Sequence, residues 1–242
     1  MKQKANYGID APNVIRNLLF IGMLCIVTSI AIFSFVDKPK MILLALTGWV
    51  LIVGISLVVT AIMMILSSKI GKIRERERIL DMVNIKGDEH ILDVGCGKGL
   101  YLIGAAKRLM NGKAVGIDIW QSEDLSGNSM ENTIQNAKSE GVDDKVYIET
   151  ADMRKIPFEN SSFDIVLSSF AIHNIYDSLE RKKALLEIIR VLKPGGKLCI
   201  IDFQHIDEYM NVFKENGITG ISRFKTKLIF PPATVIIGIK AK

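Results

Sequence analysis

A glycine-rich turn stands where an apolar run meets a helical pattern, a combination that can hold a nucleotide-like cofactor. Residues 90–100 read His-Ile-Leu-Asp-Val-Gly-Cys-Gly-Lys-Gly-Leu, with glycine at every second position from Gly95 to Gly99. This pattern predicts a strand, a tight turn and the start of a helix, where bare backbone contacts the ligand. The candidate cofactor contacts in this stretch are Asp93, Gly95, Cys96, Gly97 and Gly99.

The spacing within this loop disfavours a ligand that is held mainly by its phosphates. A dinucleotide-binding turn requires G-x-G-x-x-G, but Leu100 stands where the last glycine belongs. A P-loop requires Gly-Lys followed by Ser or Thr, whereas Lys98 is followed by Gly99. The turn therefore favours a cofactor whose amino-acid part lies against the glycines, although glycine-rich turns also serve ordinary strand-to-helix connections.

Polar residues follow the next predicted strands at the positions where each strand ends. Asp118 ends the second strand and is placed to accept both ribose hydroxyls, although a helix cap is the alternative role. Asp152 ends the third strand and can accept from an adenine amino group, while Met153 can cover the ring face. Ile119 and Ser169, at the ends of the second and fourth strands, complete the set of candidate cofactor contacts.

His173 is the candidate catalytic residue. It follows the fourth strand at the carboxyl edge of the sheet, where ligands bind in open α/β folds. Histidine is suited to accept a proton near neutral pH, so His173 is a candidate general base. A structural role, in which it caps the strand, is an equally weighted alternative. Asn174 is placed to orient a polar group of the substrate. No metal site is predicted.

From residue 86 onward, short apolar runs alternate with helical patterns. Such alternation indicates an α/β, Rossmann-like, doubly wound sheet over residues 85–242. The predicted strands are 89–95, 113–119, 145–151, 163–170, 196–202, 220–229 and 233–241, and the predicted helices are 99–110, 129–140, 178–192 and 205–216. Only Pro231-Pro232 separates the last two strands, so the seven-stranded sheet should end in a C-terminal antiparallel hairpin.

Two uncharged apolar runs precede this domain. They cover residues 17–36 and 41–66, and each is long enough to cross the ~30 Å hydrocarbon core of a bilayer as a helix. Neither run shows the amphipathic stripe of a helix on a soluble core. The first run is also longer than a usual signal-peptide core and ends without a small-x-small cleavage site. Together they predict a two-helix transmembrane hairpin with a short turn at 37–40.

Basic residues predict the orientation of this hairpin in the cell membrane. They are concentrated before the first run and after the second, at Lys2, Lys4, Arg16, Lys69, Lys72, Arg74, Arg76 and Arg78. The positive-inside rule then places both termini and the catalytic domain in the cytoplasm. The net charge of +5 and the 49% hydrophobic content favour a lipid bilayer over nucleic acid as partner. Three cysteines without C-x-x-C spacing indicate neither a disulfide framework nor a zinc site.

Two shorter segments connect the hairpin to the rest of the chain. Residues 67–84 predict an amphipathic linker helix whose apolar face carries Ile70, Ile73, Leu80 and Val83. That helix either packs on the domain or presents its charges to lipid headgroups. Residues 1–16 form a cytoplasmic segment in which Tyr7 and Asp10 are candidate substrate-side residues of a lid, with an interfacial anchor as the alternative.

The motifs together resemble a known family, the class I S-adenosylmethionine-dependent methyltransferases of the small-molecule type. The resemblance covers about residues 75–242 and rests on five motifs in the family's order, namely Leu92–Gly99, Asp118, Asp152-Met153, Phe163-Asp164 and Leu192–Gly196. The stretches Asp124–Ser129 and Tyr7–Pro12 look like a membrane-anchored bacterial branch of that family. The resemblance implies that Asp93 and the glycine loop hold the methionine part of S-adenosylmethionine, that Asp118 binds the ribose, and that Asp152 and Met153 bind the adenine.

The resemblance implies transfer of the methyl group to a small acceptor. The membrane hairpin suggests a lipophilic one, such as a quinone, a lipid or an apolar thiol or phenol, and the basic residues place the reaction on the cytoplasmic side. No N-P-P-[YF] pattern follows the fourth strand, so a nucleic-acid substrate is not expected. The segment after Asp118 is longer than usual and contains Trp120, which either covers the adenine or simply packs. A nicotinamide-dependent oxidoreductase and a non-catalytic, membrane-tethered cofactor-binding protein are the alternative functions. The acceptor atom and the oligomeric state stay open.

Overall fold

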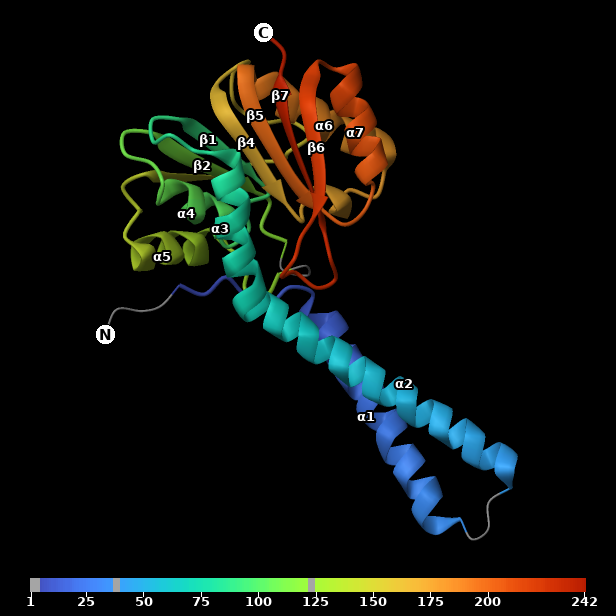
Figure 1. Cartoon of the computed structure of the whole chain (residues 1–242). Coiled ribbons are helices and arrows are strands. Elements are labelled where there is room, and N and C mark those ends of the chain that lie inside the picture. The colour runs from blue at the N-terminus through green and yellow to red at the C-terminus, as the bar shows by residue number, and fades with distance from the viewer. Residues whose placement is uncertain (1–4, 37–39, 122–124) are drawn as a thin grey trace.

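An α/β domain sits at one end of a long helical hairpin (Figure 1). The computed structural model describes residues 5–36, 40–121 and 125–242. The helices are α1 (Pro12–Phe35), α2 (Met41–Leu66), α3 (Lys72–Val83), α4 (Leu100–Ala106), α5 (Met130–Glu140), α6 (Ser178–Val191) and α7 (Ile206–Glu215). The strands are β1 (His90–Val94), β2 (Lys113–Asp118), β3 (Val146–Thr150), β4 (Phe163–Ser169), β5 (Leu192–Asp202), β6 (Ile218–Lys225) and β7 (Thr234–Lys240). The sequence-based expectations for Lys2, Lys4, residues 37–39 and Asp124 fall outside the described residues.

The predicted seven-stranded sheet is confirmed. Its strand order is β3-β2-β1-β4-β5-β7-β6, with β7 antiparallel to both neighbours and the other pairs parallel. The chain therefore reverses its direction of winding between β1 and β4, which leaves a crevice outside the carboxyl ends of those two strands. The predicted C-terminal antiparallel hairpin is β6–β7, although β6 ends at Lys225, earlier than the predicted 229.

Two hydrophobic clusters flank the sheet and make it doubly wound. One joins Leu80 of α3, Leu102 of α4 and Ala137 of α5 to one face of the sheet. The other joins Leu185 of α6 and Phe213 of α7 to the opposite face. Because the central strands β1, β4 and β5 are covered on both faces, the carboxyl edge of the sheet is where a ligand can reach them.

Small side chains let α1 and α2 pack closely. The buried positions recur at every seventh residue, at Ile15, Gly22 and Ser29 in α1 and at Thr47, Gly54 and Ala61 in α2. A Cβ atom at Gly22 would lie 2.9 Å from Gly54 O, so the two backbones approach directly. Helix α1 begins at Pro12, earlier than the apolar run at 17, because proline pre-sets the first helical turn and Arg16 is accommodated within the helix.

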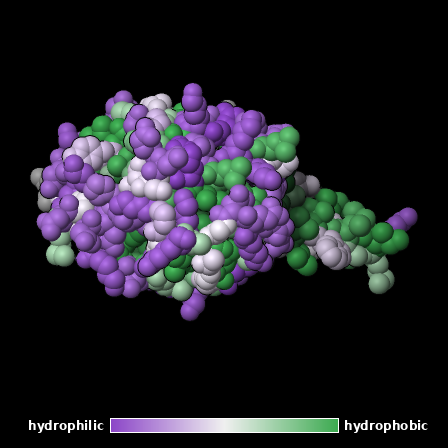
Figure 2. Space-filling view, turned by 90° about the horizontal axis from the view of Figure 1, so that it is seen from above, coloured by the Kyte–Doolittle hydropathy of each residue, from purple (hydrophilic) through white to green (hydrophobic). Residues whose placement is uncertain are grey.

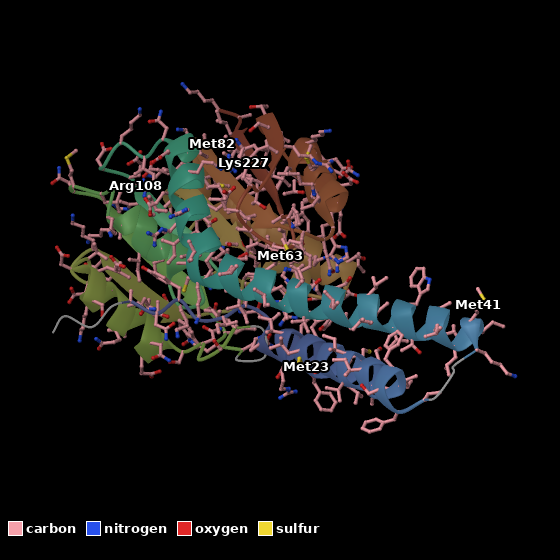
Figure 3. All side chains as sticks on the ribbon, turned by 60° about the horizontal axis from the view of Figure 1, so that its bottom comes forward. Met23, Met41, Met63, Met82, Arg108 and Lys227 are labelled. Atoms are coloured by element: carbon pink, nitrogen blue, oxygen red, sulfur yellow. The ribbon has the colours of Figure 1, made fainter. Side chains whose placement is uncertain are left out.

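The remaining surface of the hairpin is apolar and exposed. Figure 2 shows a hydrophobic rod beside the mostly hydrophilic domain, and Figure 3 shows side chains projecting around the pair. Met23, Met41 and Met63 are 52%, 86% and 43% exposed, respectively. Both helices are long and apolar enough to cross a membrane, and only 11% and 17% of their most apolar windows are buried. A helix in a soluble core would be mostly buried.

Leucine in place of Gly54 is expected to separate the two helices. A Cβ atom there would lie 2.9 Å from both Cys25 Cβ and Gly22 O. Overpacking of this kind costs about 1–3 kcal/mol, which corresponds to a roughly 5- to 150-fold larger separated population. The rate at which a bulky maleimide labels Cys25 in detergent micelles should rise in proportion.

Gly48→Leu is the matched control, because no described atom lies within 4 Å of a Cβ atom built at Gly48. Its maleimide labelling rate should equal that of the wild type. Equal rates in Gly54→Leu and Gly48→Leu would contradict the close contact.

Helix α2 continues through a π-helical turn, Ser67–Gly71, into α3. The predicted apolar face of this linker is wrong in part. Leu80 and Val83 are buried, but Ile70 is 49% exposed. The charged residues Lys72, Glu75 and Arg76 are buried instead. At about 3.6 residues per turn, Ile70 points away from the face that carries Arg76, Ile79 and Val83. Each buried charge has a partner elsewhere in the fold.

Candidate functional site

A cavity of about 790 Å³ opens at the carboxyl edge of the sheet. The predicted site residues that line it are Tyr7, Asp10, Asp93, Gly95, Cys96, Gly97, Asp118, Ile119, Asp152, Met153, Ser169, His173 and Asn174. Gly99 was also predicted as a cofactor contact, but it is the N-cap of α4. A Cβ atom at Gly99 would lie 2.9 Å from Ile103 Cδ1, so this glycine serves the strand-to-helix connection.

The glycine loop has a conformation that larger residues would strain. Gly95 and Gly97 have φ values of +72° and +52°, in the region that favours glycine. A Cβ atom at Gly95 would lie 2.3 Å from Ala171 Cβ, which leaves no space for a side chain. The backbone N–H groups of Gly95 and Cys96 both donate to Ile117 O, at 2.8 and 3.0 Å. The loop is therefore held against the end of β2.

Asp118 holds the same loop from the other side. Its Oδ2 accepts the backbone N–H of Gly97 at 2.8 Å, and its Oδ1 accepts that of Trp120 at 2.6 Å. The helix-cap alternative for Asp118 is wrong, because Ser129 caps the next helix. Of the two roles considered for Trp120, the structure supports packing, since the ring packs against a core cluster and does not line the cavity. Its indole N–H donates to Thr150 Oγ1 at 2.8 Å.

Asp93 offers a buried carboxylate oxygen to the cavity. The residue is 1% exposed, and its Oδ1 has no hydrogen-bond partner among the described residues. The pKa of Asp93 is raised to about 7, mainly by burial; a backbone hydrogen bond from Leu102 lowers it, and the nearby Asp118 contributes a smaller increase. A buried, unpaired carboxylate is costly on its own, so this oxygen fits a cationic or hydrogen-bond-donating ligand group.

The carboxylate of Asp152 is already paired. Arg154 Nε lies 2.9 Å from Asp152 Oδ2 and 3.0 Å from Oδ1, and this hydrogen bonding lowers the pKa of Asp152. The expectation of a carboxylate free to accept from a ligand is therefore modified, since Arg154 shares its lone pairs. Met153 lies across the cavity floor, where its Cε would be 3.3 Å from a Cβ atom at Gly95. Sequence reasoning missed Arg154, which sits next to Met153 in an exposed turn.

His173 lies between a carboxylate and an aromatic ring. Its Nδ1 is 2.9 Å from Asp202 Oδ1, an ion-pair distance without hydrogen-bond geometry, and its backbone N–H donates to Asp202 Oδ2 at 3.2 Å. The imidazole centroid lies 4.4 Å from that of Phe203. Asp202 is 1% exposed and also accepts from Tyr209 Oη at 3.3 Å. An imidazole beside a buried carboxylate is an arrangement that can accept a proton.

Sequence reasoning missed Asp202, although a signal existed. Asp202 ends β5, so it occupies the same kind of position as Asp118 and Asp152 on their strands. All these strands run parallel, and their carboxyl ends meet at one edge of the sheet. An acidic residue at the end of β5 was therefore a candidate by the rule already applied.

The N-terminal segment packs over the cavity and is anchored by a buried lysine. Lys72 Nζ donates to Tyr7 O, Gly8 O and Asp10 Oδ1 at 2.9, 3.0 and 3.0 Å. Asp10 Oδ2 also accepts from Ser68 Oγ at 2.8 Å. Lys72 is 5% exposed, and burial lowers its pKa while Asp10 raises it. Tyr7 and Asp10 were predicted as site residues from the sequence. Lys72 and Ser68, which hold them at the site, were not predicted as site residues.

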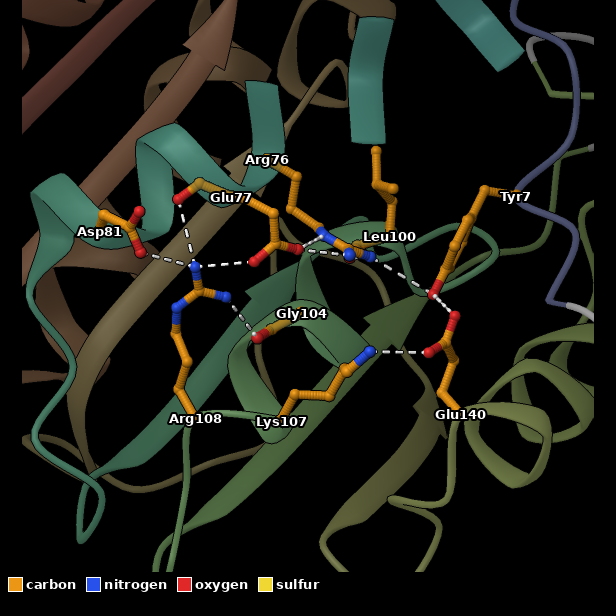
Figure 4. Close-up of polar contacts among 9 residues, drawn as sticks. All are labelled: Tyr7, Arg76, Glu77, Asp81, Leu100, Gly104, Lys107, Arg108 and Glu140. Atoms are coloured by element: carbon orange, nitrogen blue, oxygen red, sulfur yellow. Dashed lines mark hydrogen bonds and ion pairs between the residues drawn. The ribbon is translucent and has the colours of Figure 1, made fainter. Parts of the chain in front are cut away.

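Tyr7 joins a polar network behind the cavity wall (Figure 4). Its hydroxyl accepts from Arg76 Nη1 and donates to Glu140 Oε1, each at 3.4 Å, and Lys107 Nζ reaches Glu140 Oε2 at 2.8 Å. Burial is the main reason that the pKa of Tyr7 is raised to about 12. The hydroxyl is therefore a neutral tether between α3 and α5.

Further backbone contacts join the N-terminal segment to the loops around the cavity. Asn136 Oδ1 accepts the N–H of Asn6 at 2.8 Å, and its Nδ2 donates to Asn6 O and Lys98 O at 3.0 Å each. Ile9 N–H donates to Ser126 Oγ at 2.9 Å. One side chain thus links the N-terminal segment directly to the glycine loop.

The sequence is similar to known methyltransferases. Residues 85–227 match a family described as "Methyltransferase domain". The chain is 29% identical over 134 residues to a demethylmenaquinone methyltransferase of Lactiplantibacillus plantarum, covering 55% of this chain and 53% of the relative. It is 30% identical over 151 residues to the chloroplastic 2-phytyl-1,4-beta-naphthoquinone methyltransferase of Arabidopsis thaliana, covering 62% and 52%. The chain spans about half the length of these curated relatives.

Solved structures share the fold. One is an S-adenosylmethionine-dependent methyltransferase from Aquifex aeolicus, with a TM-score of 0.52 and 22% identity, covering 68% of this chain and 88% of that chain. Another is geranyl diphosphate C-methyltransferase from Streptomyces coelicolor, with a TM-score of 0.57 and 14% identity, covering 69% and 76%. At these identities the likeness concerns the fold.

Proposed function

Because the chain belongs to the class I S-adenosylmethionine-dependent methyltransferases, we propose that it methylates a small or lipophilic acceptor at the cytoplasmic face of a membrane. This proposal rests mainly on the cavity, because its lining includes both Asp93 at the glycine loop and Met64 at the domain end of α2. The relatives named for demethylmenaquinone and phytyl-naphthoquinone support a lipophilic acceptor. In this proposal the apolar hairpin is the membrane anchor.

The residues of the cavity fit S-adenosylmethionine. The unpaired Oδ1 of Asp93 suits the ammonium of the methionine part, beside the bare backbone of Gly95 and Gly97. Asp118 suits the ribose hydroxyls, and Asp152 and Met153 suit the adenine. These assignments are proposals that rest on position and on donor and acceptor chemistry.

The mechanism needs positioning and, for a protonated acceptor, one base. S-adenosylmethionine supplies a sulfonium methyl group, and its departing thioether is neutral, so no general acid is required. His173 takes a proton from the attacking atom of the acceptor, and Asp202 holds the imidazole in place. Asn174, beside His173 in the lining, orients a polar group of the acceptor. Correct alignment of the two reactants contributes about 7–11 kcal/mol.

Residues 5–11 act as a lid over the cofactor in this proposal. Tyr7 and Asp10 line the cavity, and the lid is fastened to α3 by Lys72. Lys72→Met removes a buried charge that donates to three oxygens. Since a hydrogen bond to a charged group contributes about 1.5–3 kcal/mol, we expect cofactor affinity to fall about 10- to 150-fold, measured by titration calorimetry.

Lys69→Met is the matched control, because Lys69 is an exposed lysine of the adjoining π-helical turn. Its cofactor affinity should match the wild type. Hydrogen exchange in Lys72→Met reports whether residues 5–11 are released. If the segment is released and cofactor affinity is unchanged, it is an interfacial anchor and not a lid.

Cofactor binding is expected to depend on pH through Asp93. The pKa of Asp93 is raised to about 7, so below neutral pH a proton must leave before the carboxylate can pair with an ammonium. Affinity should therefore rise about 20-fold from pH 5.5 to 7.5 and then level off. Without cofactor, the free energy of unfolding should change in the opposite direction. Because the folded protein binds a proton at Asp93 more tightly than the unfolded chain does, this free energy should fall as the pH rises from about 4 to 7.

Asp93→Asn should flatten the pH dependence of cofactor binding. Calorimetry in buffers of different ionisation enthalpy should also show that cofactor binding at pH 6 releases a proton from the wild type. In Asp93→Asn, cofactor binding should release none. An unchanged pH profile in the variant would assign the dependence to another group.

The cytoplasmic orientation rests on the basic residues at the domain end of the hairpin. Arg16, Lys69 and Arg74 are exposed there. The opposite end contains Lys40 together with residues 37–39, which include both Asp37 and Lys38. Under the positive-inside rule, this asymmetry favours the domain end in the cytoplasm.

Methyl transfer from radiolabelled S-adenosylmethionine tests the proposed function. Inverted and right-side-out membrane vesicles that contain the full chain are compared, with quinols, phospholipids, thiols and phenols as acceptors. We expect cofactor-dependent labelling of a lipophilic product in inverted vesicles only. Cofactor binding without transfer to any acceptor would instead favour a non-catalytic tether, and binding of a nicotinamide cofactor would favour an oxidoreductase.

A further inference from the structure

We propose that the cavity has a second compartment, built by the hairpin and the β6–β7 loop, that binds the apolar chain of a long-chain acceptor. This inference rests on the proposed function and deepens it, because it assigns the acceptor to lipids with a compact polar head and a long chain. The walls of the compartment are formed by Val14, Met64, Ser67, Ile229, Phe230 and Pro231.

The compartment belongs to the same cavity as the cofactor-side residues. Its walls come from the domain ends of α1 and α2 and from the loop that joins β6 to β7. In Figure 1 this loop reaches down to the junction between the domain and the hairpin. An acceptor bound along the cavity thus extends from His173 toward Val14 and Met64.

Specific hydrogen bonds fix the loop as a wall. The backbone N–H of Phe230 donates to Ser67 Oγ at 2.9 Å, and that of Lys227 donates to Glu75 Oε1 at 3.1 Å. Gly71 leaves space for the loop, because a Cβ atom there would lie 2.0 Å from Leu228 O. The π-helical turn therefore contacts this loop twice: the Ser67 hydroxyl accepts a hydrogen bond from it, and Gly71 leaves space for it.

The mouth of the compartment lies at the level of the lipid headgroups. Val14 is 49% exposed and is followed within the same helix by the basic Arg16, while Met64 precedes the exposed Lys69. Basic side chains at the cytoplasmic ends of membrane helices lie among the headgroups. Leu228, 47% exposed, adds an apolar side chain at this junction. A chain in the bilayer can thus enter sideways between the helix ends and the loop.

The polar groups are at the other end of this path. His173 and Asn174, which follow β4, line the cavity on the domain side, whereas Asp10 and Ser68 pair with each other beside the wall residue Ser67. A ligand that matches both parts has a compact polar head near His173 and an apolar chain that leaves toward the membrane. A hydrophilic metabolite would leave the apolar compartment unfilled, and a phospholipid with two chains would present more chain than one such path accepts.

Photolabelling tests the compartment without requiring catalysis. The full chain in nanodiscs is mixed with hexadecanol that carries a terminal diazirine, and labelled peptides are identified by mass spectrometry. We expect labelling within residues 226–233, which belong to neither membrane helix. In Met64→Trp the indole fills the compartment, so labelling of this peptide should fall at least about tenfold. Labels confined to the outer surface of α1 and α2 would overturn the proposal.

Leu46→Trp is the matched control, because Leu46 is 60% exposed in the same helix and does not line the cavity. Its labelling of residues 226–233 should equal that of the wild type. An equal loss in Leu46→Trp and Met64→Trp would show that the labelling reports general perturbation of the hairpin and would contradict the compartment.

Kinetics with two acceptors separates this inference from the proposed function. The acceptors are 1,4-naphthoquinol without a chain and the same head with a phytyl chain. Met64→Trp should raise KM at least about tenfold for the long-chain acceptor and leave the chainless one unchanged. If both are methylated but respond equally, the compartment fails while the methyltransferase stands. If residues 226–233 are labelled but neither quinol is methylated, the compartment stands and the quinol head is excluded.

Discussion

Replacing His173 with glutamine is expected to lower kcat about 10²- to 10⁴-fold, the range that general-base catalysis contributes. The imidazole lines the cavity and lies against Asp202 and Phe203, so its ring is oriented before any acceptor arrives. Glutamine retains polarity and similar size but cannot take a proton. Single-turnover methyl transfer measures the loss, and cofactor affinity should stay within about twofold because His173 does not lie in the glycine loop.

His90→Gln is the control for this variant, since His90 lies at the opposite, amino edge of the sheet. Its kcat should equal that of the wild type. Asp202 is a positioning residue, so Asp202→Asn should lower kcat in the wild type but add little in the His173→Gln background. Equal turnover in His173→Gln and wild type would assign the histidine a structural role at the end of β4.

Alanine at Asp118 is expected to weaken cofactor binding by about 100-fold or more. The carboxylate accepts the N–H groups of Gly97 and Trp120 and also faces the cavity. In the proposed complex the carboxylate also accepts from two ribose hydroxyls; each hydrogen bond to a charged group contributes about 1.5–3 kcal/mol, so losing both reaches this range. The substitution also leaves the glycine loop without one of its supports. Titration calorimetry with S-adenosylmethionine measures the effect.

Two further variants separate the ligand from the loop. Asp118→Asn keeps one carbonyl oxygen as acceptor, so its affinity should lie between those of Asp118→Ala and the wild type. Asp143→Ala removes an exposed carboxylate that does not line the cavity and should leave affinity unchanged. Cofactor affinity in Asp118→Ala within about threefold of the wild type would refute the ribose role, because even one such hydrogen bond contributes more.

Most of the sheet and half of the site were predictable because they depend on local signals. Apolar runs fixed the strands, and their order along the chain fixed which carboxyl ends meet at one edge. Asp93 and Asp118 line the cavity as predicted, and Gly95, Gly97 and Gly99 all stand at positions of positive φ, which select glycine. The two apolar runs likewise predicted α1 and α2 by length and composition alone.

Long-range pairing decided the rest of the site. Lys72 lies 62 positions from Asp10 in the chain, and His173 lies 29 positions from Asp202. No local pattern shows that Lys72 meets Asp10, and Lys72 reads as one of many charges on a solvated linker; for Asp202, the end of β5 gave the sheet edge but not the pairing with His173. Whether a charge is buried depends on the partners that compensate its desolvation, and only the folded chain supplies them.

The sequence by itself determined a cofactor-binding α/β domain attached to an apolar hairpin. The tertiary structure decided that residues 5–11 cover the glycine loop and that the cavity continues to the helix ends at Val14 and Met64. The reason is that periodicity specifies which face of each element is apolar, but not which other element covers it. The structure also decided that Lys72, Glu75 and Arg76 are buried while Ile70 is exposed, because the N-terminal segment and the β6–β7 loop supply partners for those charges.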